Sequence, residues 1–192
     1  MQSASPGFQP AGRAPAPPPL DLVQDFVNTE IPEWAQDDIA TPELFGDWLR
    51  ARSLLEVDDV VAAEVFVSAR VLRASLRRLA LLNTLGERPD EQARIELESA
   101  LAPVRYGVVP SNRGELRLTP IGPGGRDALG AIVARVLEAQ ATGAWSRLKA
   151  CRKPGCGWLF YDGSRNASSI WCSMSICGNR TKTAAYRRRR QA

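Results

Sequence analysis

The stretch CRKPGCGWLFYDGSRNASSIWCSMSICGNRTKTAAYRRRR, residues 151–190, contains all four cysteines of a 192-residue chain that has no histidine. Cys151 and Cys156 form one C-x4-C pair, and Cys172 and Cys177 form a second. Fifteen residues lie between the two pairs, a separation that is typical of two metal-binding knuckles. The four thiols therefore predict one metal site that organises this end of the chain.

Zinc is the metal that this ligand set favours. Four thiolates complete its tetrahedral coordination and leave no open position for water, so the predicted zinc is structural. The alternatives are two disulfides, a redox dithiol and ordinary buried thiols. We favour zinc over these because the N-terminus has no apolar secretory segment, a C-x-x-C motif is absent and the cysteines are confined to one end.

Further motifs in the same segment point to a known family. Residues 151–190 resemble the CGNR zinc-finger family, named for the tetrapeptide that stands here at 177–180; CRKPGC, WLFYD, SRN and WCSM match as well. Upstream, LVQDFVNT at 22–29, the helix around Trp48 and the arginine-rich helix around Arg70 are similar to the ABATE domain that usually precedes this finger. The resemblance implies a stress-linked bacterial transcription regulator. Relatives often carry arginines just before WCSM, whereas this chain has Ser168-Ser169-Ile170.

Charge is divided unevenly along the chain, whose formal net charge is +4. From Arg147 onward, eleven Lys or Arg residues accompany one acidic residue, Asp162, which gives a net charge of +10. The preceding residues hold fourteen basic and twenty acidic side chains, which gives −6. An acidic body with a basic end is expected for a protein that binds a polyanion, although a solubilising tail is the alternative for the arginines at 187–190.

We predict three regions and a mainly α fold. Residues 1–20, rich in Pro, Ala and Gly, are expected to form a disordered leader that adds nothing to the core. Residues 21–144 are expected to form a helical, ABATE-like body with a small β-hairpin. Residues 145–192 are expected to form the zinc-finger DNA-binding domain, which ends in a basic helix.

Capping and periodicity indicate the elements of the body. Helices are predicted from Thr41-Pro42, from the residues after Asp58 to Gly86, over 90–101 and over 127–140, with a short helix over 145–150 leading into the first cysteine. Residues 104–109 and 115–120 flank SNRG and predict the hairpin. The acidic pairs 37–38 and 58–59 are expected to cap helices rather than to bind metal.

Catalysis is not expected. The absence of histidine removes the usual general base and the Ser-His and Cys-His nucleophile pairs. The chain also lacks the G-x-x-x-x-G-K-[ST] and G-x-G-x-x-G motifs of phosphate-binding loops. Trp158, Phe160 and Trp171 are interpreted as the small core of the finger rather than as base-stacking rings, whereas either role remains open for Tyr161.

The predicted DNA-binding residues surround and follow the last cysteine. A helix from Asn179 would place Arg180, Lys182 and Arg187 in the major groove, with further arginines on phosphates. Arg165, between the knuckles, is a second candidate for backbone contact. The full predicted set is Arg165, Asn179, Arg180, Lys182, Tyr186, Arg187, Arg188, Arg189 and Arg190.

The leading hypothesis is a cytoplasmic regulator that binds double-stranded DNA. Its body would sense a small-molecule effector or form a homodimer, and an RNA polymerase contact is a further possible partnership; no membrane association is expected. Arg70 and Arg73 are weak candidates for binding an anionic effector, and Asn28 and Thr29 are added through the family resemblance alone. The alternative hypothesis is an RNA-binding or protein-interaction adaptor.

Overall fold

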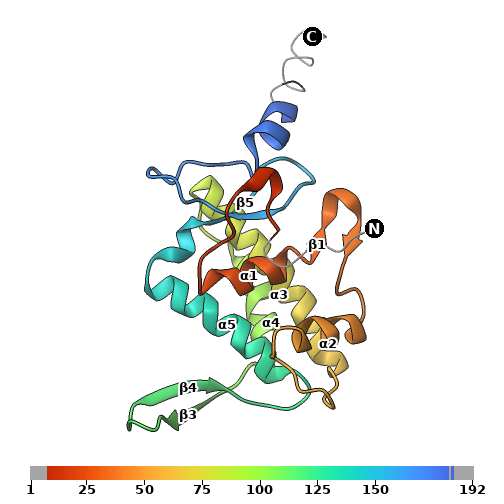
Figure 1. Cartoon of the computed structure of the whole chain (residues 1–192), viewed down its shortest axis with the longest axis vertical. Coiled ribbons are helices and arrows are strands. Elements are labelled where there is room, and N and C mark those ends of the chain that lie inside the picture. The colour runs from red at the N-terminus through yellow and green to blue at the C-terminus, as the bar shows by residue number, and fades with distance from the viewer. Residues whose placement is uncertain (1–7, 182, 184–192) are drawn as a thin grey trace.

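The computed structural model describes residues 8–181 and residue 183, and its fold is mainly α, as predicted (Figure 1). The helices are α1 (Leu20–Val27), α2 (Pro42–Arg50), α3 (Ala63–Leu85), α4 (Glu91–Leu101) and α5 (Arg126–Ala141). The strands form antiparallel pairs: β1 (Glu30–Ile31) with β2 (Gln36–Asp37), β3 (Tyr106–Pro110) with β4 (Leu116–Pro120), and β5 (Leu148–Ala150) with β6 (Leu159–Tyr161). Short turns of 3-10 helix cover Pro10–Gly12, Pro32–Trp34 and Ala144–Arg147, and a π-helical turn covers Met174–Gly178.

The long helix α3 is the centre of the body. Leu72 and Leu76 lie on its buried face, which packs against α1, α4, α5 and β5. Phe26 from α1 and Phe45 from α2 join the same core, with ring centroids 6.2 Å apart. The apolar spacing of three and four residues along α3 accounts for this arrangement, because it forms one continuous stripe.

The predicted helix boundaries are largely confirmed. The Thr41 hydroxyl accepts a hydrogen bond from the Leu44 amide at 3.3 Å, and the Asp90 carboxylate accepts one from the Ala93 amide at 2.8 Å. Both side chains therefore act as N-caps. Gly86 ends α3 with a φ of 72°, a left-handed conformation that glycine adopts without strain.

The predicted hairpin is confirmed as β3 and β4. Its register pairs Val108 with Leu118 and Pro110 with Leu116. Figure 1 shows this ribbon projecting from the end of the body that lies opposite the finger. No helix among residues 8–181 combines the length and the apolar composition needed to cross a bilayer.

The predicted helix over 145–150 is wrong. A single 3-10 turn, Ala144–Arg147, is followed at once by β5, whose Leu148 pairs with Tyr161 of β6. Asn83 of α3 fixes this change of direction, because its amide donates to the carbonyl oxygens of Trp145 and Leu148, each at 2.9 Å. The partner strand β6 is eleven positions from β5 in sequence, so a local pattern could not reveal it.

The predicted disordered leader is wrong for residues 8–19. Arg13 donates hydrogen bonds to the carbonyl oxygens of Tyr161 and Trp171, and its guanidinium lies 4.5 Å from the ring centroid of Phe160. Ala16 is buried, and its amide donates to the Gln24 side chain at 2.7 Å. A Pro-rich segment becomes ordered here because the backbone of the finger supplies its partners.

Candidate metal centre and nucleic-acid interface

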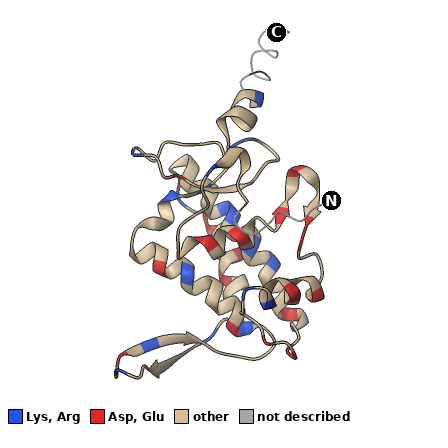
Figure 2. Ribbon diagram, in the orientation of Figure 1, with Lys and Arg blue, Asp and Glu red and all other residues tan. Residues whose placement is uncertain are grey.

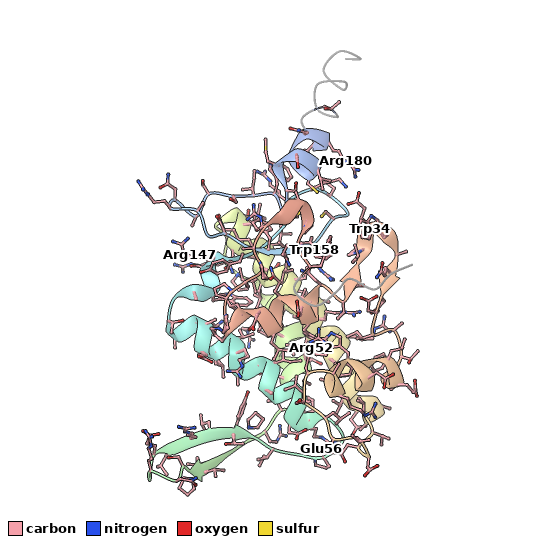
Figure 3. All side chains as sticks on the ribbon, viewed as in Figure 1. Trp34, Arg52, Glu56, Arg147, Trp158 and Arg180 are labelled. Carbon is pink, nitrogen blue, oxygen red and sulfur yellow. The ribbon has the colours of Figure 1, made fainter. Side chains whose placement is uncertain are left out.

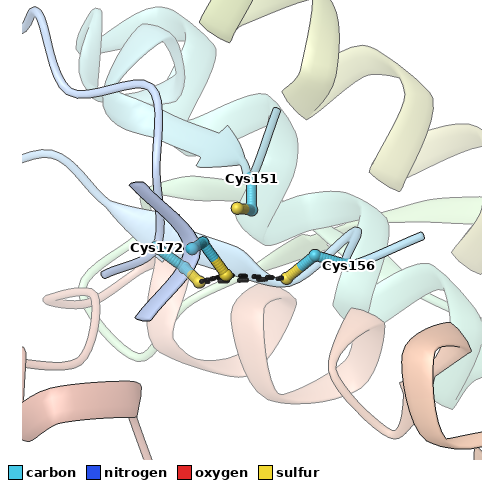
Figure 4. A group of neighbouring side chains, drawn as sticks. Cys151, Cys156 and Cys172 are labelled. Carbon is cyan, nitrogen blue, oxygen red and sulfur yellow. Dashed lines mark hydrogen bonds between the residues drawn. The ribbon is translucent and has the colours of Figure 1, made fainter. Parts of the chain in front are cut away.

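The four cysteines meet at one buried point. Cys151 directly follows β5, Cys156 lies in the turn before β6, and the π-helical turn Met174–Gly178 contains Cys177 and follows Cys172 (Figure 4). All four sulfurs lie within 4.8 Å of one another. The sulfur of Cys156 lies 3.8 Å from that of Cys172 and 3.8 Å from that of Cys177, and the last two sulfurs are 3.6 Å apart.

These distances fit a zinc ion. Four sulfurs at about 2.3 Å from a central zinc form a tetrahedron with edges of about 3.8 Å. Burial raises the pKa of the Cys177 thiol, and hydrogen bonding to Cys151 raises that of Cys172. Four thiolates could not remain charged so close together in a buried site without a cation. Cys151, Cys156, Cys172 and Cys177 are therefore positioned to hold one structural zinc ion, as the sequence predicts.

Backbone geometry shapes the first knuckle. Gly155 and Gly157 flank Cys156 with φ values of 80° and 61°, which side chains rarely adopt. The Cys151 amide donates to the Trp158 carbonyl at 2.9 Å and closes this turn. At the other end, the Thr84 hydroxyl of α3 donates to the Ala150 carbonyl at 2.7 Å. The body thus fixes the strand that presents the first ligand.

A small apolar cluster surrounds the cysteines. Trp158 and Phe160 are buried in it, Trp171 is partly buried, and Ile31 joins them from the body. The Trp158 ring nitrogen donates to the side-chain amide oxygen of Gln9 at 3.1 Å. The interpretation of Trp158 and Phe160 as core residues is confirmed. Tyr161 is partly buried against the main core.

A buried ion pair braces the loop between the knuckles. Asp162 is fully buried, and one carboxylate oxygen accepts from the Lys149 ammonium at 3.0 Å and from the Ser169 amide at 2.8 Å. The other oxygen accepts from the hydroxyl and the amide of Ser164. Burial acts to raise the pKa of Asp162, but these hydrogen bonds outweigh it and lower the pKa well below its usual range. Sequence reasoning missed this role, although Asp162 is the single acid of the basic segment.

Two models of known families match the chain, and their matches meet at residue 147. One, described as "Putative stress-induced transcription regulator" (ABATE), matches residues 20–147. The other, described as "CGNR zinc finger", matches residues 147–190. The chain belongs to the ABATE family. A search of curated proteins gives no significant match. The order of an ABATE domain followed by a CGNR finger is the one that the sequence motifs predict.

The structure describes part of the predicted DNA-binding set. Asn179 and Arg180 are exposed on the helical turn that continues from Cys177, and Figure 3 shows Arg180 near the C-terminal end of the described residues. Arg165 is exposed in the loop between the knuckles. The other predicted contacts lie outside the described residues; they are Lys182, Tyr186, Arg187, Arg188, Arg189 and Arg190.

One carboxylate of the ABATE domain contacts the base of the finger's terminal helix. Glu33 lies in the turn between β1 and β2, and one of its oxygens forms ion pairs with Lys153 at 2.5 Å and with Arg180 at 3.4 Å. Hydrogen bonding to Glu33 raises the pKa of Lys153. The Arg180 side chain remains 64% exposed. No sequence motif marks Glu33, because only the fold of the β1–β2 turn brings it to the finger.

Three of the four predicted effector-binding residues form hydrogen bonds within the chain. The Asn28 amide group donates to the Leu159 carbonyl at 2.9 Å, and its oxygen accepts from the Leu159 amide at 2.8 Å, so it pairs with β6 as a strand would. Arg73 is buried and donates to Thr29 at 3.0 Å and to both oxygens of Asp37. Ligand binding by these residues stays a prediction, and a ligand would have to displace native partners.

The remaining residue, Arg70, is exposed on α3, beside Phe66. The prediction that Asp37 caps a helix is wrong, because it lies in β2 and pairs with Arg73. Burial acts to raise the pKa of Asp37, but hydrogen bonding to Arg73 outweighs it and lowers the pKa. The arginine-rich face of α3 thus serves in part to hold the β1–β2 hairpin.

A cavity of about 260 Å³ lies beside the zinc centre. Its walls come from the N-terminal segment, the β1–β2 turn and the finger, and include Phe8, Trp34, Trp158, Glu33 and Arg180. Trp34 is largely exposed at its rim. The cavity is therefore apolar, with one carboxylate and one guanidinium at its edge.

Proposed function

We propose that this ABATE–CGNR chain is a cytoplasmic transcription regulator that binds double-stranded DNA through its finger. The main observation in support is that Arg180 is exposed on the turn that follows the last zinc ligand. Zinc would fix this turn relative to the body, and the basic segment from Arg147 onward supplies the charge that a phosphate backbone requires. Figure 2 shows most acidic residues lying on the body, away from this end.

We assign two kinds of DNA contact to the finger: contacts with bases, which select a sequence, and contacts with phosphates. Arg180 and Lys182 would enter the major groove from the terminal helix, and a guanidinium there can pair with guanine. Arg165 and the arginines at 188–190 would contact phosphates, which position the protein without selecting a sequence. Ring stacking by Trp158 is not part of the proposal, because that ring is buried.

The ABATE body would supply regulation. The cavity beside Glu33 and Trp34 supports binding of a small apolar effector, because it is lined by rings and touches Arg180. An effector there would change the Glu33–Arg180 contact and so the DNA affinity. Homodimerisation and a contact with RNA polymerase are further roles that we assign to the body.

We also propose that the protein has no catalytic activity. The zinc site is filled by four cysteines, so no coordination position is open for a reacting water. The chain has no histidine to act as a general base. A turnover that is lost in Cys156→Ser, in protein that circular dichroism shows to be folded, would contradict this.

A gel shift at several salt concentrations tests DNA binding against the adaptor hypothesis. The purified zinc-loaded protein is titrated onto the DNA upstream of its own coding sequence, onto scrambled DNA of equal length and onto RNA of equal length. We expect the upstream DNA to bind at least about a thousandfold more tightly than the scrambled DNA. Equal affinity for all three probes would instead indicate a general polyanion binder, and no binding would favour a protein-interaction adaptor.

Glu33→Gln is expected to tighten DNA binding. The substitution keeps the size of the side chain but removes the charge that competes with phosphate for Arg180 and Lys153. Exposed ion pairs contribute about 0.2–1 kcal/mol, so the affinity for both specific and scrambled DNA should rise about 1.4- to fivefold. Glu98→Gln is the matched control, because it removes the same charge from an exposed ion pair with Arg94 on α4. An unchanged affinity in Glu33→Gln would show that DNA does not compete for Arg180.

Arg180→Ala tests whether Arg180 contacts a base or only a phosphate. If Arg180 pairs with a guanine, its loss should lower the preference for specific over scrambled DNA by about 1–3 kcal/mol. Arg189→Ala should weaken binding to both DNAs equally and reduce the salt slope by about one, as expected for one lost phosphate contact. Equal losses on both DNAs for Arg180→Ala, with zinc retained, would exclude a base contact.

A further inference from the structure

The hairpin β3–β4 has one face made only of apolar residues. Opposed residues of an antiparallel pair project to the same side of the sheet. Every second pair of this register therefore lies on the same side of the ribbon. The residues on that side are Tyr106, Val108, Pro110, Leu116, Leu118 and Pro120. A ribbon that is exposed on both sides would be expected to have polar residues on both faces, and this face has none.

The base of this ribbon is fixed to α5. The Tyr106 hydroxyl donates to the Gly130 carbonyl at 2.7 Å. A side chain at Gly130 would place its Cβ 2.7 Å from the Cβ of Pro120, so the glycine permits close packing. The direction in which the ribbon projects is therefore set by the body.

The outer part of the same face is uncovered. Val108 is 64% exposed, Leu116 74% and Leu118 70%. We call residues 106–120 the arm. Contiguous apolar surface of this kind marks an interaction site, and an isolated two-stranded hairpin gains stability from a partner.

A recess on the same end of the chain has the complementary character. A cavity of about 250 Å³ lies between α2 and the segment before α3, and Pro42, Gly46 and Val60 line it. Val60 is 74% exposed, and Val57 is exposed nearby. Glu43 and Asp47 also line the recess, and the adjoining loop contains Glu56, Asp58 and Asp59.

Charge matches the two surfaces. The turn and outer strand of the arm contain Arg113 and Arg117 against one acid, Glu115. The recess and its loop are dominated by carboxylates, with Arg50 among them. The arm points away from α2 of its own chain (Figure 1), so the recess that it can reach belongs to another molecule.

We propose that the occupant is a second copy of this chain, and that each copy packs Leu116 and Leu118 of its arm into the recess beside Val60 of the other. A two-fold axis forms this contact twice and leaves neither arm unpaired. Because the contact forms twice, the buried area is doubled. This brings the interface closer to the roughly 800 Å² per partner of a stable interface. This rests on the homodimerisation in the proposed function, whereas DNA binding is independent of it.

Sedimentation velocity of the full-length, zinc-loaded protein tests this without DNA. The wild-type protein should be a dimer at micromolar concentration. Leu116→Asp/Leu118→Asp in the arm and Val60→Asp in the recess should each weaken the dimer at least about a hundredfold, because both contacts bury a charge in every altered dimer. Val67→Asp is the matched control, because Val67 is 60% exposed on α3 and outside both surfaces.

Mixing the two variants distinguishes reciprocal exchange from a contact between arms. A mixed dimer keeps one intact contact, from the unaltered arm of the Val60→Asp chain to the unaltered recess of the arm variant. It should therefore form more tightly than either variant alone. A monomeric wild-type protein, a dimer unaffected by the arm substitutions, or no gain on mixing would each overturn the proposal, while leaving the gel-shift result for DNA binding unchanged.

Discussion

Cys172→Ser should abolish stoichiometric zinc binding and unfold the finger. Binding of a structural zinc contributes about 10 kcal/mol or more to the folding of a small domain, and three thiolates with a hydroxyl do not complete the site. Trp158 and Phe160 would lose the cysteines around which they pack. Elemental analysis should fall from one zinc per chain to near zero, and the fluorescence of the buried tryptophan should shift to the red.

Most of the helical signal should survive this substitution. Helices α2 to α5 pack around Leu72, Leu76 and Ile132, in a core that is distinct from the cysteine cluster. Far-ultraviolet circular dichroism should therefore change little. Met174→Ser is the control, because Met174 is exposed and follows Cys172 by two residues without being a ligand. Retention of stoichiometric zinc in Cys172→Ser, or wild-type protein purified without chelators that holds no metal, would contradict the four-thiolate site.

Local signals predicted the parts of the fold that local chemistry determines. The equal spacing of the two cysteine pairs predicted one metal site, because two short turns can each present two sulfurs. Thr41 and Asp90 marked helix starts because a side-chain oxygen there satisfies an amide of the first turn. The apolar residues that flank Ser111 to Gly114 predicted the arm, although not that one face of it would be left uncovered.

Other features depend on partners distant in sequence. Arg13 is ordered by hydrogen bonds to the carbonyl oxygens of Tyr161 and Trp171. The amino-acid composition of residues 1–20 could not indicate these partners. Asn28 completes β6 across more than a hundred residues. The strands β1 and β2 have two residues each, too few for a periodic pattern, and Arg73 and Arg77 hold them from α3. Of the two arginines of α3 that the sequence suggested for anion binding, Arg73 takes part in these ion pairs and Arg70 is exposed.

The interface between the ABATE domain and the finger follows from the same contacts. Leu148 and Leu159, on the two strands that lead to the knuckles, are buried in the main core of the body. The finger is therefore attached to the body by strands that share the core of the body. In the proposed function, a change at the β1–β2 turn would reach Arg180 through its contact with Glu33.

Asp162→Ala should destabilise the protein by about 3–5 kcal/mol, the cost of leaving a buried charge without its partner. The Lys149 ammonium is buried and would keep only the carbonyl oxygens of Ala167 and Ser169 as acceptors. The amide of Ser169 and the amide of Ser164 would lose their acceptor as well. Urea unfolding at a fixed free zinc concentration, followed by tryptophan fluorescence, measures the change.

The contribution of Asp162 to the free energy of unfolding should depend on pH in one direction. Because the folded-state pKa of Asp162 lies well below the usual range of an aspartate, its contribution is fully present above that range and is lost as the pH falls through the folded pKa. The difference in unfolding free energy between wild type and Asp162→Ala should therefore be constant near neutral pH and shrink only in acid.

The double variant Asp162→Ala/Lys149→Met identifies the cause. If the unpaired ammonium is responsible, replacing it with an apolar side chain of similar length should recover a large part of the lost stability. If the lost hydrogen bonds to Ser164 and Ser169 dominate instead, the double variant should be as unstable as Asp162→Ala. A single variant within about 1 kcal/mol of wild type would show that the pair does not brace the loop, since removing one partner of a buried pair costs more than that.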